Sequence, residues 1–180
     1  LGIPVHGYDA QTHDHITQVP GSFQQTCAGL KNLLAYRFHV ELRIVVSQIS
    51  AAYIDRIAEL IVSEFASVSC VKIIGLEMLG NAAKNQETVW IPYPEAFEKS
   101  KNAIMTFITA GIDVGLYNFP LCAVDPKFWP ICAQSITDYK VRFSDACNGC
   151  AVKDACGGIF AGTYRLAKAN IAPIGDNVVC

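Results

Sequence analysis

The sequence predicts an α/β fold in which parallel strands alternate with helices, followed by an irregular extension that carries most of the cysteines. Two observations predict it. Six of the eight cysteines lie in the last third of the chain, and before them apolar runs alternate with amphipathic helical patterns. Strands that alternate with helices of this length are joined in parallel by crossover connections. The apolar runs that we assign to strands are residues 2–6, 39–46, 69–75 and 112–118.

Four such strands make half of an eight-stranded (β/α) barrel of the TIM type, or one side of an open barrel. We therefore expect a partial TIM-like barrel over residues 1–121. The alternation ends near Cys122, and a short helical stretch over residues 126–139 leads into a loop rich in cysteine and glycine. Residues 122–180 are expected to form a separate, small, irregular extension.

Each predicted helix has a recognisable beginning or end. Ser22 followed three residues later by Gln25 has the pattern of a capping box and predicts a helix to about residue 36. Residues 51–66 place their apolar side chains on one stripe. The third helix starts near Tyr93 with proline in its first turn, and Gly111 is placed to end it. The polar residues 7–20 predict a loop, as do those between the third strand and the third helix.

Composition and charge exclude several classes of protein. Just over half of the 180 residues are apolar and 17% are charged, which is typical of a globular domain. The net charge of −2 provides no basic field for nucleic acid or an anionic membrane. No apolar run reaches the length of a bilayer span. The chain begins at Leu1 without the features of a signal peptide, so we expect a cytoplasmic protein from which an upstream part is missing.

The strongest chemical signal is the run Cys147, Cys150 and Cys156, spaced as C-x2-C-x5-C and followed by Gly157 and Gly158. Two thiolates in a C-x2-C turn can bind adjacent positions of one metal centre, and the third can occupy another. Glycine allows the backbone to approach an inorganic core closely, because it has no Cβ. Thiolates are the usual ligands of iron–sulfur clusters and also of zinc. The spacing alone leaves a cluster and a zinc ion equally open.

A fourth ligand is normally required. The first candidate is Cys122, which directly follows the last predicted strand, then Cys132, then Cys180. Cys27 and Cys70 lie in apolar patterns and are interpreted as small core residues. A disulfide framework is less favoured, because the first two thirds of the chain form an ordinary hydrophobic sequence that requires no crosslinks.

Cys147, Cys150 and Cys156 followed by Gly-Gly resemble the auxiliary-cluster extensions, called SPASM or twitch domains, of radical S-adenosylmethionine (SAM) enzymes. The rest of the chain is similar, in the order of its motifs, to the radical SAM maturases of the His-Xaa-Ser system. The corresponding segments are Gly75–Met78, Trp90–Pro92, Tyr117–Cys122, Ser135–Asp138 and Cys147–Gly158. This resemblance covers essentially the whole chain.

The resemblance implies an auxiliary iron–sulfur cluster of the 4Fe–4S type, SAM as cosubstrate, and a His-Xaa-Ser-type peptide as substrate, with a partner maturase as a further candidate partner. In such enzymes SAM gives a 5′-deoxyadenosyl radical that abstracts hydrogen from the peptide. Arg43 could pair with the SAM carboxylate, and His6 and Glu77 fall at strand ends where other SAM contacts would lie. Each of the three has a plain alternative. Arg43 could form an ion pair with a neighbour such as Glu41, His6 could be a core histidine with its hydrogen bonds satisfied, and Glu77 could be a solvated charge in a loop.

One departure from the family limits this reading. The SAM-cleaving motif C-x3-C-x2-C is absent from the sequence, and the first three barrel strands have no counterpart. We therefore expect this chain alone to be inactive, with the radical chemistry belonging to a complete protein.

Two other hypotheses remain. The chain could be a zinc-stabilised α/β module that binds peptides without catalysis, or a TIM-barrel enzyme whose cysteines are incidental. The run His13, Asp14, His15 is a weak metal signal and is more typical of a polar loop or helix entry.

Overall fold

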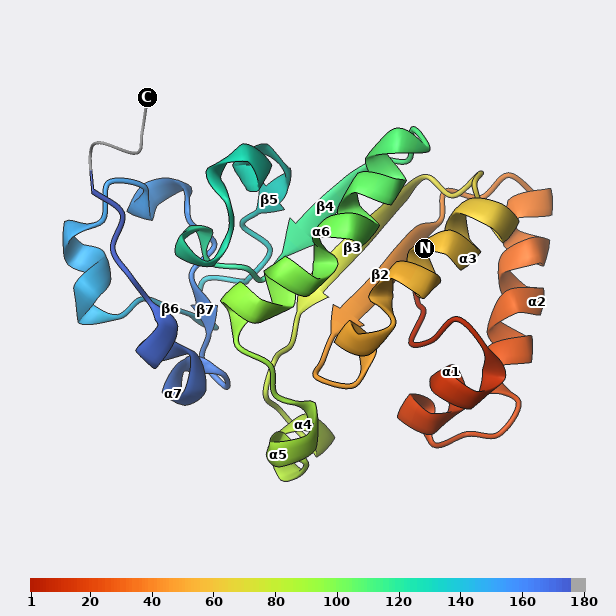
Figure 1. The fold of residues 1–180 in the computed structure, drawn as a ribbon, viewed down its shortest axis with the longest axis horizontal. Coiled ribbons are helices and arrows are strands. Elements are labelled where there is room, and N and C mark those ends of the chain that lie inside the picture. Colours follow the sequence, from red (N-terminus) through yellow and green to blue (C-terminus); the bar gives the residue numbers. More distant parts are fainter. Residues whose placement is uncertain (176–180) are drawn as a thin grey trace.

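In the computed structural model, which describes residues 1–175, the chain forms a five-stranded parallel sheet and, beyond one edge of it, a two-stranded antiparallel sheet (Figure 1). The strands of the large sheet lie in chain order from β1 to β5, and each neighbouring pair is parallel. These strands are β1 (Gly2–Pro4), β2 (Glu41–Val46), β3 (Cys70–Gly75), β4 (Val114–Tyr117) and β5 (Cys132–Ala133). The small sheet pairs β6 (Val141–Arg142) with β7 (Ile159–Phe160).

Over residues 1–175, seven α-helices connect and cover these strands. They are α1 (Ala10–Thr17), α2 (Ser22–Ala35), α3 (Ile54–Glu64), α4 (Asn81–Lys84), α5 (Gln86–Val89), α6 (Tyr93–Thr109) and α7 (Tyr164–Ala167). Short 3-10 helices occupy Ser50–Ala52, Leu121–Ala123, Pro126–Ile131, Asp145–Gly149, Lys153–Ala155 and Lys168–Asn170. Five of these six short helices lie beyond β4, where the regular alternation ends.

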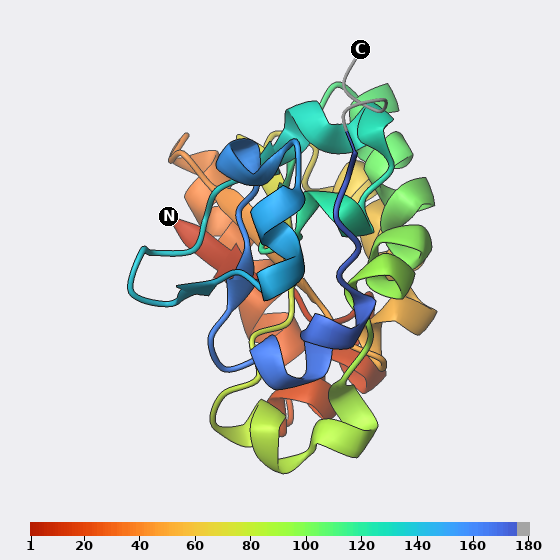
Figure 2. The ribbon, with the colours of Figure 1, turned by 90° about the vertical axis from the view of Figure 1, so that its left-hand side faces the viewer.

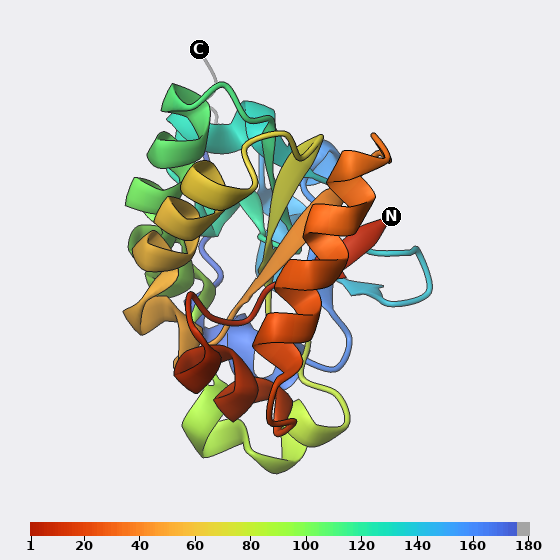
Figure 3. The same cartoon turned by 90° about the vertical axis from the view of Figure 1, so that its right-hand side faces the viewer.

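The core lies between the sheet and the helices α3 and α6, which pack beside each other (Figure 3). In β2 the side chains alternate: Leu42 and Ile44 are fully buried, whereas Arg43 between them is exposed. Ile57 of α3 and Phe107 of α6 are also fully buried. Alternating strand residues point to opposite faces of a sheet, so one face of β2 packs into this core and the other carries polar side chains.

The predicted α/β fold with parallel strands is confirmed. Over residues 1–175 the sheet is open, with β1 at one edge and β5 at the other. Closure into a TIM-like barrel remains a prediction. The predicted end of the third helix at Gly111 is correct, because this residue adopts a left-handed backbone conformation, φ 72°, just after the helix.

The loop predicted for residues 7–20 is wrong, because it contains α1. Asp9 caps this helix: its Oδ1 accepts the Thr12 backbone N–H at 2.8 Å, and the Thr12 hydroxyl also donates to Asp9 Oδ1. The helix was missed because its eight residues have no strong apolar stripe, so the sequence shows little helical periodicity there. A capping box is therefore present at α1, where the sequence analysis did not place one.

The capping box predicted at Ser22 and Gln25 is also wrong. The N-cap of α2 is Gly21, and no side chain of that residue caps the helix. Asp14, from α1, instead accepts the backbone N–H groups of Gly21 at 2.6 Å and Phe23 at 2.8 Å and the Ser22 hydroxyl at 2.8 Å. The acceptor for the first turn thus comes from the preceding helix, which a local pattern cannot reveal.

β5 was not predicted either. It has only two residues, Cys132 and Ala133, and pairs with Leu116 and Tyr117 of β4. The segment Pro126–Ile131 before it is a 3-10 helix, whereas a helical stretch was expected to continue to residue 139. The large sheet therefore extends into the part of the chain assigned to the extension.

Candidate metal centre

Four cysteines from separate parts of the chain line one small cavity, which we call the cysteine cavity. Cys122 lies in the 3-10 turn that follows β4, and Cys147 lies in the turn Asp145–Gly149. Cys150 and Cys156 are the residues that end two successive 3-10 turns. Short turns therefore aim all four side chains at one space beside the large sheet.

The cysteine cavity is mostly apolar and small. Val152, Ile159 and Ile171 contribute to its walls, and its free volume is about 20 Å³, close to the space needed by one water molecule. The residues that line it include no aspartate or glutamate, but they include Arg142 and Lys153. Arg142 Nη1 donates to the carbonyls of Tyr139 and Val141, and Lys153 Nζ donates to Asn148 Oδ1, so these hydrogen bonds of the two cations go to oxygen atoms and not to the sulfurs.

Each of these sulfur atoms has a polar partner. Cys156 Sγ accepts the backbone N–H groups of Leu121 and Gly158, both at 3.4 Å. Cys150 Sγ accepts the Ile174 N–H at 3.5 Å. The remaining two sulfurs are also contacted: a backbone hydrogen bond from Ala172 reaches the Cys122 thiol, and Ser144 Oγ lies 3.4 Å from Cys147 Sγ. Hydrogen bonds of this kind stabilise a thiolate and tune the potential of an iron–sulfur cluster.

Burial opposes ionisation of two of these thiols. It raises the pKa of Cys156, and the N–H groups of Leu121 and Gly158 only partly oppose this rise. Burial likewise raises the pKa of Cys122, against the hydrogen bond from Ala172. The negative charges of the other cysteine thiolates push both pKa values further up. A bound cation would reverse this balance, and binding would release protons.

The other cysteines lie elsewhere or outside the described residues. Cys132 is not among the residues that line the cysteine cavity: its S–H donates to the Phe128 carbonyl at 3.5 Å, and burial raises the pKa of this thiol to about 12. Cys70 is buried in β3, and Cys27 packs against the core. Cys180, the third candidate for the fourth ligand, lies outside the described residues.

Over residues 1–175 every cysteine is a free thiol. Within the same range, no three His, Cys, Asp or Glu side chains converge closely enough to hold a single metal ion. The four sulfurs therefore border a shared cavity without meeting at one point. The donor set consists of soft sulfur, which selects iron–sulfur clusters or zinc over hard cations.

The three residues expected to contact SAM are not brought together. Arg43 forms an ion pair with Glu41, with 2.7 Å between Nε and Oε1, which is its plain alternative. Glu77 lies 3.6 Å from Lys140 Nζ in an ion pair, so it is not a free loop charge. Of the three, only His6 lines the larger cavity described next.

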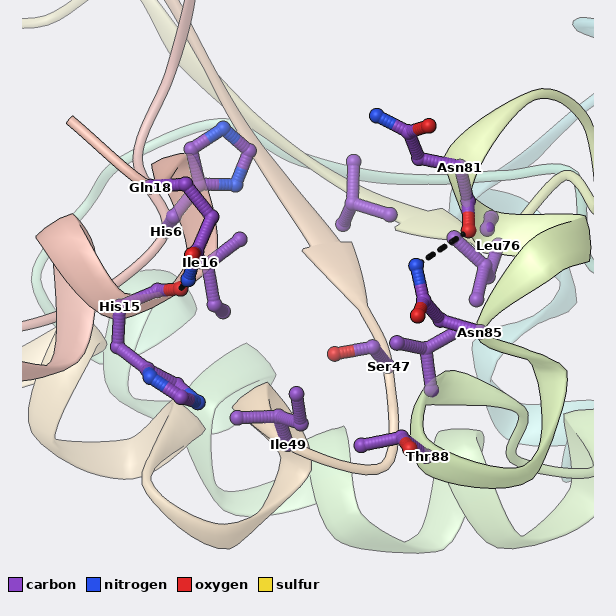
Figure 4. Close-up of a pocket in the computed structure, with 13 residues that line it drawn as sticks. His6, His15, Ile16, Gln18, Ser47, Ile49, Leu76, Asn81, Asn85 and Thr88 are labelled. Atoms are coloured by element: carbon purple, nitrogen blue, oxygen red, sulfur yellow. Dashed lines mark hydrogen bonds between the residues drawn. The ribbon is translucent and has the colours of Figure 1, made fainter.

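This larger cavity, which we call the carboxyl-edge cavity, lies where β1, β2 and β3 end (Figure 4). Its volume is about 540 Å³, within the range of small-molecule sites. Figure 4 shows His6, His15 and Gln18 on one side and Asn81, Asn85 and Thr88, from α4 and α5, on the other. Burial lowers the pKa of His6, and the charge of His13 lowers it further. The imidazole of His6 is therefore neutral near pH 7.

His13, Asp14 and His15 do not form a metal site. His13 is buried and its Nδ1 accepts the His6 backbone N–H at 3.3 Å, while Asp14 holds the start of α2. His15 faces the carboxyl-edge cavity. The expected role at a helix entry is correct for Asp14.

The groups that surround the sulfurs could not be predicted from the sequence. The donors at Leu121, Gly158, Ala172 and Ile174 are backbone N–H groups, which every non-proline residue has. No residue type signals them. The positive charge of Arg142 at the cavity is equally a product of the fold, since this residue lies in β6.

A comparison of this chain with protein-family models, with curated proteins and with solved structures finds no match. Over residues 1–175 no helix is both long and apolar enough to cross a membrane. The chemistry of the cysteine cavity is therefore the basis on which a function can be argued.

Proposed function

We propose that this chain binds an iron–sulfur cluster through Cys122, Cys147, Cys150 and Cys156, as the auxiliary-cluster part of a radical SAM peptide-modifying enzyme. The observation that carries the proposal is that these four thiols, from three stretches of the chain, line one cavity. Four thiolates are the usual ligand set of a 4Fe–4S cluster.

The surroundings of the sulfurs support a cluster. The cavity walls are mostly apolar and include no carboxylate, and backbone N–H groups donate to the sulfurs. Hydrogen bonding to sulfur, burial and net charge are the means by which a protein sets a cluster's potential. When bound, the cluster would supply one-electron chemistry. The chain's own residues would ligate it, shield it from water and donate hydrogen bonds to its sulfur ligands.

Zinc is the second candidate, and one observation favours it. The free volume of about 20 Å³ is too small for a cluster, which would require the cysteine-bearing turns to move apart, whereas a single ion would require the four sulfurs to move closer together. Four thiolates around one zinc ion lie about 3.8 Å from each other, given a zinc–sulfur distance of about 2.3 Å. In that case the chain would be a zinc-stabilised module without redox chemistry.

SAM and the substrate peptide enter this proposal through the resemblance alone. SAM cleavage in the family requires a C-x3-C-x2-C motif, which these 180 residues do not contain. We therefore assign to this chain the binding of the cluster and a share in binding a His-Xaa-Ser-type peptide, within a protein that adopts a TIM-like barrel.

Metal analysis tests the proposal. Protein purified and reconstituted without oxygen should be brown and hold about four iron and four sulfide per chain. The variants Cys147→Ala, Cys150→Ala, Cys156→Ala and Cys122→Ala should each lose most of that iron. Colourless protein with about one zinc per chain would support the second candidate instead.

Cys132→Ala provides the matched control for Cys122→Ala. Cys132 is also a partly buried thiol beyond β4, but it does not line the cysteine cavity. Its replacement should leave the iron content unchanged. If Cys132→Ala loses iron and Cys122→Ala does not, the ligand set proposed here is wrong. If none of the cysteine variants changes the metal content, the cysteines are incidental.

The peptide part is tested separately. A labelled peptide with His-Xaa-Ser repeats should bind the metal-loaded chain, measured by fluorescence anisotropy, more tightly than a peptide of the same composition in scrambled order. Equal binding of the two would remove the support for a His-Xaa-Ser substrate without affecting the metal proposal.

A further inference from the structure

The residues that follow Cys156 lead along a short segment, held at most positions by hydrogen bonds, to the loop that follows β3. The Gly158 N–H donates to Cys156 Sγ, and β7 then pairs with β6. The next residue, Ala161, donates its N–H to the Lys140 carbonyl at 2.8 Å. Hydrogen bonds or strand pairing thus hold residues 158–161 and Thr163, which lies seven positions beyond the cysteine.

Thr163 ends this path with two hydrogen bonds to the loop after β3. Its side chain is completely buried, its Oγ1 accepts the Met78 N–H at 3.0 Å, and its hydroxyl donates to the Leu76 carbonyl at 3.3 Å. Gly162 packs so closely that a Cβ there would lie 2.9 Å from the Met78 carbonyl oxygen. Lys140, whose carbonyl accepts the Ala161 N–H, forms an ion pair with Glu77 of the same loop.

The loop held by Thr163 forms and positions one wall of the carboxyl-edge cavity. Leu76 lines the cavity, and the chain then continues into α4 and α5, which supply Asn81, Asn85 and Thr88. These two helices have four residues each, too few to be stable without tertiary contacts. Figures 1 and 2 show α7, which starts directly after Thr163, on the same side of the molecule as α4 and α5.

We propose that Thr163 is a positioning residue through which metal binding at the cysteine cavity orders the α4–α5 wall of the carboxyl-edge cavity. This inference rests on the proposed function, because it requires a metal centre at Cys156. A ligated Cys156 fixes β7, and β7 fixes the Thr163 hydroxyl that holds Leu76 and Met78. The two cavities are then coupled by a contiguous chain of contacts with a defined last link.

Amide hydrogen exchange measured by mass spectrometry tests the coupling. In the wild-type chain, peptides covering residues 76–89 should exchange about tenfold more slowly with metal bound than after chelation. Thr163→Val keeps the shape of the side chain and removes the hydroxyl. We expect this variant to hold the same amount of metal while residues 76–89 exchange fast in both states, and Thr163→Ser to restore the metal-dependent protection.

Thr106→Val is the matched control, because Thr106 also donates a hydroxyl to a backbone carbonyl but lies on α6, distant in sequence from the loop. It should behave as wild type. If metal binds but residues 76–89 exchange equally in both states of the wild-type chain, the coupling is disproved and the proposed function stands. That wild-type comparison decides the question even if Thr163→Val does not fold. A chain that binds no metal would overturn the proposed function and this inference together.

Discussion

Replacing Asn118 by alanine tests how firmly the end of β4 is held before the chain turns toward Cys122. Asn118 is 8% exposed and has φ 63°, in the left-handed region. Its Oδ1 accepts the Ser135 hydroxyl at 2.9 Å, and its Nδ2 donates to the Gly75 carbonyl at 3.4 Å. One side chain thus connects the ends of β3 and β4 to the segment after β5.

Two costs add in Asn118→Ala. Alanine in the left-handed region costs about 1 kcal/mol more than asparagine or glycine. Leaving the two buried partners without their hydrogen bonds costs about 2 kcal/mol. We therefore expect the free energy of unfolding to fall by about 3 kcal/mol, and Tm to fall by about 6–12 °C for a chain of this size.

The assay is urea unfolding followed by far-UV circular dichroism, at equal metal content for all variants, because bound metal adds its own stabilisation. Asn118→Gly relieves the backbone strain and keeps the hydrogen-bond loss, so it should be about 1 kcal/mol more stable than Asn118→Ala. A loss below about 1 kcal/mol in Asn118→Ala, or identical stabilities of the two variants, would refute this assignment.

Three further perturbations test the fold in the same urea assay. Phe107→Ala should lower the free energy of unfolding by about 3–5 kcal/mol, because this ring is fully buried, whereas Phe38→Ala, at a half-exposed ring, should change it by less than about 0.5 kcal/mol; equal losses would contradict the assigned core. Gly75→Ala should cost about 1–3 kcal/mol, since its Cβ would lie 2.7 Å from a backbone oxygen and from an aromatic ring, and a neutral result would show that the strands can separate there. Burial lowers the pKa of both His6 and His13 below 6.5, so the unfolded chain binds more protons than the folded chain. The stability that depends on these neutral imidazoles should therefore be present above about pH 6.5 and be lost as the pH falls below it, with a smaller loss in His13→Gln. A pH-independent free energy of unfolding would contradict this expectation.

Much of the fold was predictable because a long periodic pattern of apolar residues fits either a helix or a strand, but not both. The strand at Cys70–Gly75 and the helix from Tyr93 to Gly111 were predicted nearly to the residue. The features that were missed are short or depend on distant partners. β5 has two residues, and at the start of α2 the backbone N–H groups of Gly21 and Phe23 donate to the carboxylate of Asp14, which lies on another helix. Neither leaves a periodic pattern in the local sequence.

The candidate site divides in the same way. The spacing of Cys147, Cys150 and Cys156 identified three side chains that the fold places on one cavity. Cys122 was ranked above Cys132 only because it directly follows a predicted strand. In the fold, Cys122 lines the cavity and Cys132 does not. The carboxyl-edge cavity was not predicted as such, because residues from α1, the end of β2 and the α4–α5 segment meet there only after folding.

Mössbauer spectroscopy of the chain, reconstituted without oxygen using isotopically enriched iron, measures the environment of every iron atom bound. The account predicts one dominant quadrupole doublet from iron coordinated by four sulfur atoms, retained in Cys132→Ala and lost in Cys156→Ala. Signals from scattered high-spin iron bound to oxygen and nitrogen, unchanged by Cys156→Ala, would contradict a cluster held by the four cysteines.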